Sequence, residues 1–207
     1  MFSEEAKWIE QALQMIIIND DKTAINFGSS TLYFREHIQP HIQNYIFGPL
    51  EKKGWNILHV DIKKGEGIDM VADLTDASFN TNFKEKAALV ICTNMLEHVT
   101  DIKLAVNNLI TACKQNGYML ITVPYKYKKH LDPIDNMFRP TPAEIADLFT
   151  HANVNVIDDG IITIEDKSYY RIKKSAIPFW GYRERLLYYL GKRHKVSAVL
   201  LKLNGVS

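Results

Sequence analysis

The sequence has few cysteines, no long apolar run and almost no net charge. Cys92 and Cys113 fall in stretches that predict a buried strand and a helix. Neither has the spacing of metal ligands, so we expect reduced core thiols. No apolar run approaches the roughly 20 residues that a membrane-spanning helix needs, and the start of the chain is acidic where a signal peptide would be basic. We therefore expect a soluble, cytoplasmic protein.

The low net charge combines two unlike regions. The 207 residues hold 25 basic and 24 acidic side chains, a formal charge of +1. From Lys167 to the end there are ten basic residues and one acidic residue, whereas the preceding 166 residues hold 15 basic and 23 acidic ones. The tail thus carries +9 and the body −8. Such asymmetry often marks a surface for an acidic partner.

Short apolar strands alternate with helices along the body. Ser3 is predicted to cap a helix that ends near residues 19–21, and a second helix follows Gly28. Asp101 is expected to cap a helix that stops at residues 116–117. Thr141 begins a capping box, so a helix is expected to about residue 151. The pattern predicts a three-layer α/β fold with a mostly parallel sheet. The expected strands are 23–27, 56–60, 68–73, 87–92, 118–123 (ended by Pro124), 154–157, 161–164 and 196–203.

Polar residues follow the first three of these strands. In such folds ligands bind beyond the carboxyl ends of the strands. Gly28-Ser29-Ser30 offers a close backbone approach, hydroxyls and helix N-terminal amides. Asp61 could accept both hydroxyls of a ribose, and Asp73-Leu74 could meet an adenine amino group. The plainer alternatives are a strand-to-helix turn, a solvated aspartate and a helix N-cap.

The stretch Thr93-Asn94-Met95-Leu96-Glu97-His98-Val99 follows the fourth expected strand. With the glycine turn, the acidic end of the second strand and the Asp-Leu pair in this order, it resembles the class I S-adenosylmethionine-dependent methyltransferases. The similarity is strongest to the type 11-like branch, which has an N-x-L-E-H-V signature here, and it covers about residues 23–164. It implies a Rossmann-like sandwich with a seven-stranded sheet whose last strand is antiparallel, and S-adenosylmethionine as cofactor.

Carried over position by position, the resemblance implies a cofactor site. The first loop would hold the methionine end, Asp61 the ribose, Asp73-Leu74 the adenine, and residues 94–96 the floor beneath the sulfonium. Asn26 stands where the family usually has an acidic residue, and the first crossover, which contains Arg35, could overhang the pocket. The implied cofactor-binding residues are Asn26, Gly28, Ser29, Ser30, Asp61, Ile62, Asp73, Leu74, Asn94, Met95 and Leu96.

The resemblance alone implies that the long polar loop 124–140 faces the acceptor. His130 is our first candidate for a catalytic base because imidazole titrates near neutrality, with Asp132 or Asp135 to orient it. His98, beside Glu97 in the signature, is the second candidate. For each histidine the alternative is a hydrogen bond that braces the loop.

Tyr125, His130 and Arg139 are the candidate acceptor contacts. Arg139 could clamp a carboxylate or phosphate, or simply pair with Asp135. A metal ion bound by His98, His130, Asp132 and Asp135 is less favoured, because the spacing matches no motif of defined ligand geometry. We therefore predict no metal.

The tail over residues 167–195 interleaves aromatic and basic residues. Phe179, Tyr182, Leu186 and Tyr189 share a helical face. The favoured interpretation is a helix that packs on the acidic body or forms a homodimer contact. A membrane surface or another anionic partner is the alternative, and nucleic acid is the partner we expect least.

These observations predict a single domain, residues 1–207. It comprises an N-terminal helix over 1–21, a cofactor-binding core over 22–164, and a basic aromatic C-terminal helix with the last strand over 165–207. The predicted activity is methyl transfer from S-adenosylmethionine to an oxygen of a small molecule or saccharide. The alternatives are N-methylation and a catalytically silent cofactor-binding partner protein.

Overall fold

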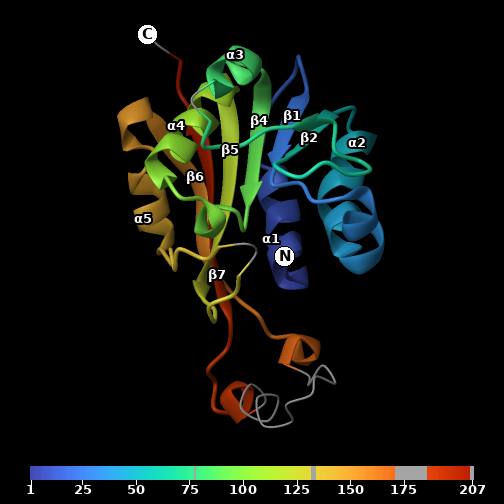
Figure 1. Cartoon of the computed structure of the whole chain (residues 1–207), viewed down its shortest axis with the longest axis vertical. Coiled ribbons are helices and arrows are strands. Elements are labelled where there is room, and N and C mark those ends of the chain that lie inside the picture. The colour runs from blue at the N-terminus through green and yellow to red at the C-terminus, as the bar shows by residue number, and fades with distance from the viewer. Residues whose placement is uncertain (77, 132–133, 171–185, 206–207) are drawn as a thin grey trace.

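A seven-stranded sheet forms the centre of the computed structural model, which describes residues 1–76, 78–131, 134–170 and 186–205 (Figure 1). Within these residues the strand order is β3-β2-β1-β4-β5-β7-β6. Neighbours pair in parallel except β7, which is antiparallel to both β5 and β6. The predicted Rossmann-like architecture with an antiparallel last strand is confirmed. The strands are β1 (Thr23–Phe27), β2 (Asn56–Asp61), β3 (Met70–Val71), β4 (Ala87–Thr93), β5 (Cys113–Lys126), β6 (Val154–Thr163) and β7 (Lys195–Leu203).

Helices cover both faces of this sheet. The α-helices are α1 (Ser3–Leu13), α2 (Gly48–Lys52), α3 (Phe79–Phe83), α4 (Ile102–Ala112) and α5 (Pro142–Asp147). There are also two π-helical turns, η1 (Phe34–Ile38) and η2 (Gln43–Phe47), and three 3₁₀ turns, η3 (Leu96–His98), η4 (Thr150–Ala152) and η5 (Lys167–Tyr170). Residues 186–189 are helical as well.

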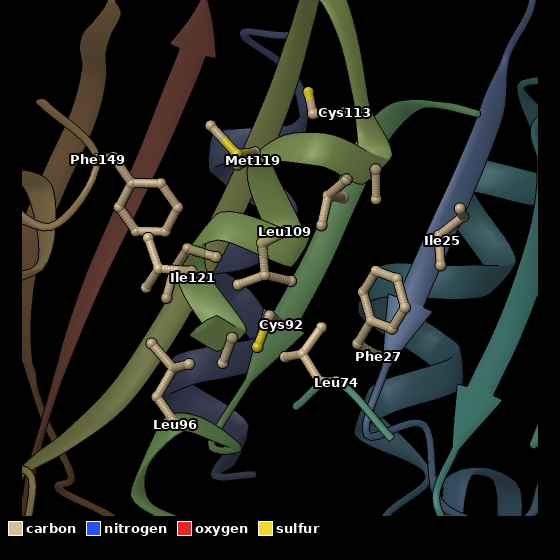
Figure 2. Close-up of a cluster of buried hydrophobic side chains, with 14 of the residues drawn as sticks. Ile25, Phe27, Leu74, Cys92, Leu96, Leu109, Cys113, Met119, Ile121 and Phe149 are labelled. Atoms are coloured by element: carbon tan, nitrogen blue, oxygen red, sulfur yellow. The ribbon is translucent and has the colours of Figure 1, made fainter. Parts of the chain in front are cut away.

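Alternating side chains of the central strands divide the core into two layers. On β4, Val90 and Cys92 join a cluster with α3, α4 and α5, which Figure 2 shows around Leu109. Leu89 and Ile91 point to the opposite cluster, with α1, η2 and α2. Strand side chains alternate between the two faces. Because both faces are covered here, β4 is apolar throughout its buried length. This continuous apolar run is typical of a parallel strand covered on both sides.

The N-terminal helix differs from its prediction. Ser3 is its first residue rather than its cap, and the preceding Phe2 N–H donates to Glu5 Oε2 at 3.1 Å. The helix ends at Leu13 rather than near residues 19–21. Three consecutive isoleucines at 16–18 follow, and β-branched side chains disfavour helix.

Three strand boundaries were also predicted wrongly. Cys113 begins β5 instead of lying in the preceding helix. Pro124 lies inside β5, because beyond Thr122 that strand pairs only with β7 and a missing N–H interrupts little. The two short strands expected at 154–157 and 161–164 are one edge strand, β6, in which the turn-like residues around Gly160 pair with β7 through a shifted register.

Other expectations agree with the structure. Asp101 Oδ1 caps α4 by accepting from Leu104 N at 3.0 Å. Thr141 and Glu144 form the predicted capping box of α5, although that helix ends at residue 147 and continues only as the turn η4. Both cysteines are free and buried.

Residues 164–170 and 186–194, between β6 and β7, lie beyond the end of the sheet at which β1 and β4 terminate (Figure 1). Tyr170, Tyr188, Ile164 and Val196 form a small separate core there. The predicted helical stripe lies partly outside the described residues, since Phe179 and Tyr182 fall in 171–185, while Leu186 and Tyr189 are exposed. Among the described helices none is long and apolar enough to cross a membrane.

Candidate active site

A cavity of about 1330 Å³ lies at the carboxyl ends of β1, β2 and β4. Its wall also includes Phe2 and, from the tail, Tyr169. Of the described site predictions, Leu96, Tyr125, Asp135 and Arg139 are not among its lining residues, and Asp132 lies outside the described residues. The predicted residues on its wall are Asn26, Gly28, Ser29, Ser30, Asp61, Ile62, Asp73, Leu74, Asn94, Met95, His98 and His130.

The loop after β1 is held in a tight turn. Gly28 has φ +72° and Ser30 has φ +56°. The amides of Gly28 and Ser29 both donate to Val60 O of β2, at 2.9 and 3.1 Å. A Cβ added to Gly28 would lie 3.0 Å from Met95 Sδ, so this position requires glycine for both its conformation and its space.

Arg35 supports this loop from beneath. The residue is 2% exposed, and its guanidinium donates to Ser29 O, Ser30 O and Gly67 O. The arginine therefore braces the loop, while other residues of the first crossover, among them Phe34 and His41, line the cavity. Ser30 O also accepts from the Ser29 hydroxyl at 3.2 Å, whereas a buried carbonyl left without a donor is costly.

Asp61 joins the first two loops. Its Oδ2 accepts from Ser30 N at 2.8 Å and its Oδ1 from Lys63 N at 3.0 Å. An ionised carboxylate has about four acceptor positions, so both oxygens keep capacity for ligand hydroxyls. The neighbouring Ile62 is exposed on the cavity wall.

Asp73 and Leu74 are placed differently from one another. Asp73 Oδ1 accepts from Thr75 N and Thr75 Oγ1, at 2.8 and 2.7 Å, so this aspartate closes a turn and does not cap a helix. The Leu74 side chain belongs to the core in Figure 2, and its carbonyl accepts from Asn108 Nδ2 at 2.8 Å. Leu96 is likewise fully buried in that core.

Asn26 is paired with a neutral histidine. Asn26 Nδ2 donates to His59 Nδ1 at 3.2 Å. Burial, together with the charge of Arg35, lowers the pKa of His59 to about 4. An unprotonated ring nitrogen needs a donor, which an amide supplies and a carboxylate cannot. This pairing accounts physically for the asparagine at this position.

Glu5 is a site residue that the sequence reasoning missed. It is fully buried, and its Oε1 accepts from Asn94 Nδ2 and from Thr122 Oγ1, both at 2.6 Å. Asn94 has φ +49°, so the carboxylate fixes a left-handed residue at the end of β4. In the sequence Glu5 stands out only as part of the acidic start of the chain, and nothing local indicated these distant partners.

On the acceptor side the two predicted histidines lie together. The rings of His98 and His130 are 4.9 Å apart at 90°. His98 Nδ1 is hydrogen-bonded to Ile134 O, which requires a proton on Nδ1. Burial is the main cause that lowers the pKa of His130, and the neighbouring His98 lowers it further. The His130 ring is therefore largely neutral near pH 7.

Asp135 anchors the loop rather than lining the cavity. It accepts from His130 N at 2.9 Å and from Arg139 Nη2 at 2.7 Å, and its Oδ2 is 3.4 Å from His130 Nδ1. Burial opposes ionisation, yet hydrogen bonds led by Arg139 hold its pKa below the usual range. Arg139 thus makes the pairing with Asp135 that was the alternative to an acceptor clamp.

Glu97 lies between the β4 end and these histidines. Its side chain is fully buried, and within the described part of the chain neither carboxylate oxygen has a hydrogen-bond partner. Burial raises its pKa to about 8. The sequence pointed to Glu97 only as a letter of the signature.

Comparison with known proteins agrees with this geometry. No curated protein matches the sequence significantly. A chain of the complex between the Haloferax volcanii Trm112 methyltransferase activator and its candidate methyltransferase is 15% identical, with a TM-score of 0.63, covering 99% of this chain and 92% of that one. A SAM-dependent methyltransferase from Archaeoglobus fulgidus is 12% identical, with a TM-score of 0.57 and coverage of 95% and 94%.

A third similar structure is the geranyl diphosphate C-methyltransferase of Streptomyces coelicolor A3(2), solved with Mg²⁺, geranyl diphosphate and S-adenosyl-L-homocysteine. It is 12% identical, with a TM-score of 0.60, and the match covers 97% of this chain and 77% of that one. At such identities these structures show the shared fold. The family model for the methyltransferase domain matches residues 6–159. The chain therefore belongs to the methyltransferase domain family, as its sequence signature predicted.

Proposed function

We propose that this protein binds S-adenosylmethionine and transfers its methyl group to an oxygen of a small molecule or saccharide. The observation that carries the proposal is the cavity, which extends from the Gly28 loop and Asp61 to His98 and His130. Its volume of about 1330 Å³ exceeds the range of roughly 300–1,000 Å³ that is typical of single-ligand pockets. It therefore has room for a cofactor and an acceptor side by side.

The residues on the cofactor side fit this ligand chemically. Gly28 has no side chain, so a ligand in the cavity can approach its backbone closely. A side chain at this position would also meet Met95. Asp61 keeps acceptor positions for two ribose hydroxyls, and Ile62 offers an exposed apolar surface beside them. In this proposal the 28–30 loop holds the methionine end and Asn94 and Met95 lie beneath the sulfonium. The cofactor would supply an activated methyl group with a good leaving group.

The chain itself must position the acceptor and remove its proton. Alignment of the acceptor oxygen with the methyl group is the larger part of such catalysis. His130 is the first candidate for the base, since its ring lies on the cavity wall and is largely neutral near pH 7. His98 is the second candidate, although its Nδ1 is engaged with Ile134 O.

Isothermal titration calorimetry with S-adenosylhomocysteine tests the cofactor assignment. The wild-type protein should bind one equivalent, and Asp61→Ala should weaken binding on the order of 10-fold to 100-fold, because one to two charge-assisted hydrogen bonds are lost. Asp159→Ala, on the exposed part of β6, is the matched control. Absence of binding to the wild-type protein would overturn the proposal.

Two alternatives remain as outcomes of the same programme. Binding without turnover across a broad acceptor panel would favour a catalytically silent partner protein, the candidate that Asn26 motivates. An unchanged rate in His130→Ala would favour N-methylation, where a base is hardly needed. A similar fold occurs in complex with an activator protein, so association with a second chain can matter for activity in this fold. Assaying the panel at several protein concentrations also tests for the homodimer that the sequence suggested.

A further inference from the structure

Three side chains that can bind metals converge at the acceptor side of the cavity. Glu97, His98 and His130 each offer one ligand atom, and these atoms all lie within 4.8 Å of one another. Glu97 and His98 come from η3 after β4, and His130 comes from the loop after β5. All three line the cavity. The cluster differs from the set considered from the sequence, because Glu97 replaces the two aspartates.

The carboxylate of Glu97 is the least satisfied polar group of this region. It is fully buried, and both oxygens are without a hydrogen-bond donor in the described part of the chain. Its nearest charged or titratable neighbour is His98, whose Nε2 is 3.7 Å from Oε1. Burying an unpaired carboxylate is very unfavourable, which is why burial raises the pKa of Glu97. A positive group between the carboxylate and the rings would stabilise the ionised form.

The tautomer of His98 makes its inner nitrogen a ligand. Because Nδ1 donates to Ile134 O, the neutral ring has its lone pair on Nε2, which faces Glu97. Two acceptors thus point toward the same space. A hydrogen bond from the outer ring nitrogen to a backbone carbonyl is the usual outer-sphere support of a metal-binding histidine.

His130 is held less directly than His98. Asp135 Oδ2 accepts from the His130 amide at 2.9 Å and lies 3.4 Å from the ring Nδ1, which makes no hydrogen bond within the described residues. Arg139 in turn fixes Asp135 at 2.7 Å. A carboxylate behind Nδ1 favours a proton on that atom and leaves the lone pair on Nε2.

We propose that Glu97, His98 and His130 bind one divalent transition-metal ion of the zinc type. Two imidazoles and one carboxylate are a set that such ions accept, and three protein ligands leave a coordination position open. Because all three residues line the cavity, the open position could take a hydroxyl of the acceptor. The role toward the acceptor rests on the proposed methyl transfer, whereas binding of the ion does not.

An ion here would change the work assigned to His130. A metal-bound hydroxyl is far more acidic than a free one, so its proton could pass to water in the open cavity. His130 would then hold the ion and would not itself accept the proton.

Spectroscopic titration with Co²⁺ tests the site directly. Chelator-treated protein without an affinity tag should bind one equivalent of Co²⁺ with visible d–d absorption, and Zn²⁺ should displace it. Glu97→Gln and His130→Ala should each weaken the affinity for Co²⁺ on the order of 100-fold, because each removes a direct ligand and even outer-sphere changes cost 10-fold to 100-fold. His151→Ala is the control, because this exposed histidine is hydrogen-bonded to Asn107 Oδ1 at 2.9 Å and is not among the residues that line the cavity.

Folding and cofactor binding are checked on the same samples. Circular dichroism should show that all variants are folded, and calorimetry should show whether they bind S-adenosylhomocysteine. If the folded wild-type protein binds no Co²⁺, or if Glu97→Gln binds it as tightly as the wild type, the metal site is wrong. Retained cofactor binding in that case would leave the proposed function intact, while metal binding without cofactor binding would overturn the function alone.

Discussion

Arg35 offers the sharpest test of how the first loop is built. The variant Arg35→Met keeps the length of the side chain but removes the guanidinium donors to Ser29 O, Ser30 O and Gly67 O. Ser30 O keeps the Ser29 hydroxyl as a donor at 3.2 Å, whereas each of the other two carbonyls, left without this donor, costs roughly 1–3 kcal/mol. Because removal of the buried charge offsets part of this cost, we expect a net loss of about 2–4 kcal/mol in the free energy of unfolding.

Urea unfolding followed by circular dichroism measures this loss. For a chain of this size each kcal/mol lowers the melting temperature by about 2–4 °C, so thermal unfolding should shift by roughly 10 °C. Lys22→Met is the matched control, because Lys22 Nζ also donates to a carbonyl, Lys53 O at 3.0 Å, but at the exposed surface. There we expect less than about 1 kcal/mol. Equal stability of Arg35→Met and the control would refute the assigned role of the arginine.

Three further predictions concern pH, the cofactor floor and the acceptor loop. The pKa of His59 falls from 6.5 to about 4 on folding, so its neutral form contributes stability that is complete above pH 6.5 and lost toward pH 4. Between pH 7 and 5 this amounts to about 2 kcal/mol, and urea unfolding of His59→Gln should show a pH dependence smaller by that amount; an unchanged dependence would contradict the pairing. Glu5→Gln should raise the dissociation constant for S-adenosylhomocysteine several-fold in calorimetry, because it weakens the hold on Asn94, and unaltered affinity would exclude this positioning role. Arg139→Gln should free Asp135 and lower kcat by about 10-fold or more while cofactor affinity is kept; a loss in cofactor affinity alone would show that the arginine acts elsewhere.

The sequence predicted the fold well where periodicity was strong. The apolar run of β4 and the caps Asp101 and Thr141 indicated elements that the structure contains. Boundaries failed where tertiary pairing overrides local preference. Pro124 is tolerated because β5 has one neighbour there, and the residues around Gly160 extend because β7 pairs with them.

The candidate site was predictable only in its local parts. Gly28, Asp61 and Asn94 follow strands directly, so their place at one edge of the sheet could be inferred from order along the chain. The roles of Glu5 and Arg35 were not predicted, because their partners are carbonyls and side chains that only the folded chain brings near. The lack of any donor to Glu97 is likewise a property of packing, which no spacing in the sequence reveals.

The contacts of Glu5 also bear on when the site can form during folding. They join residues 89 and 117 positions apart in the chain, to Asn94 and to Thr122. The entropy of closing such loops must be met before their hydrogen bonds can form, and distant contacts of this kind slow folding. The floor of the cavity therefore cannot take its final shape until β5 has been synthesised and α1 has docked on the sheet. A nascent chain that ends before residue 122 would hold a nearly complete first half of the sheet and yet have no formed site.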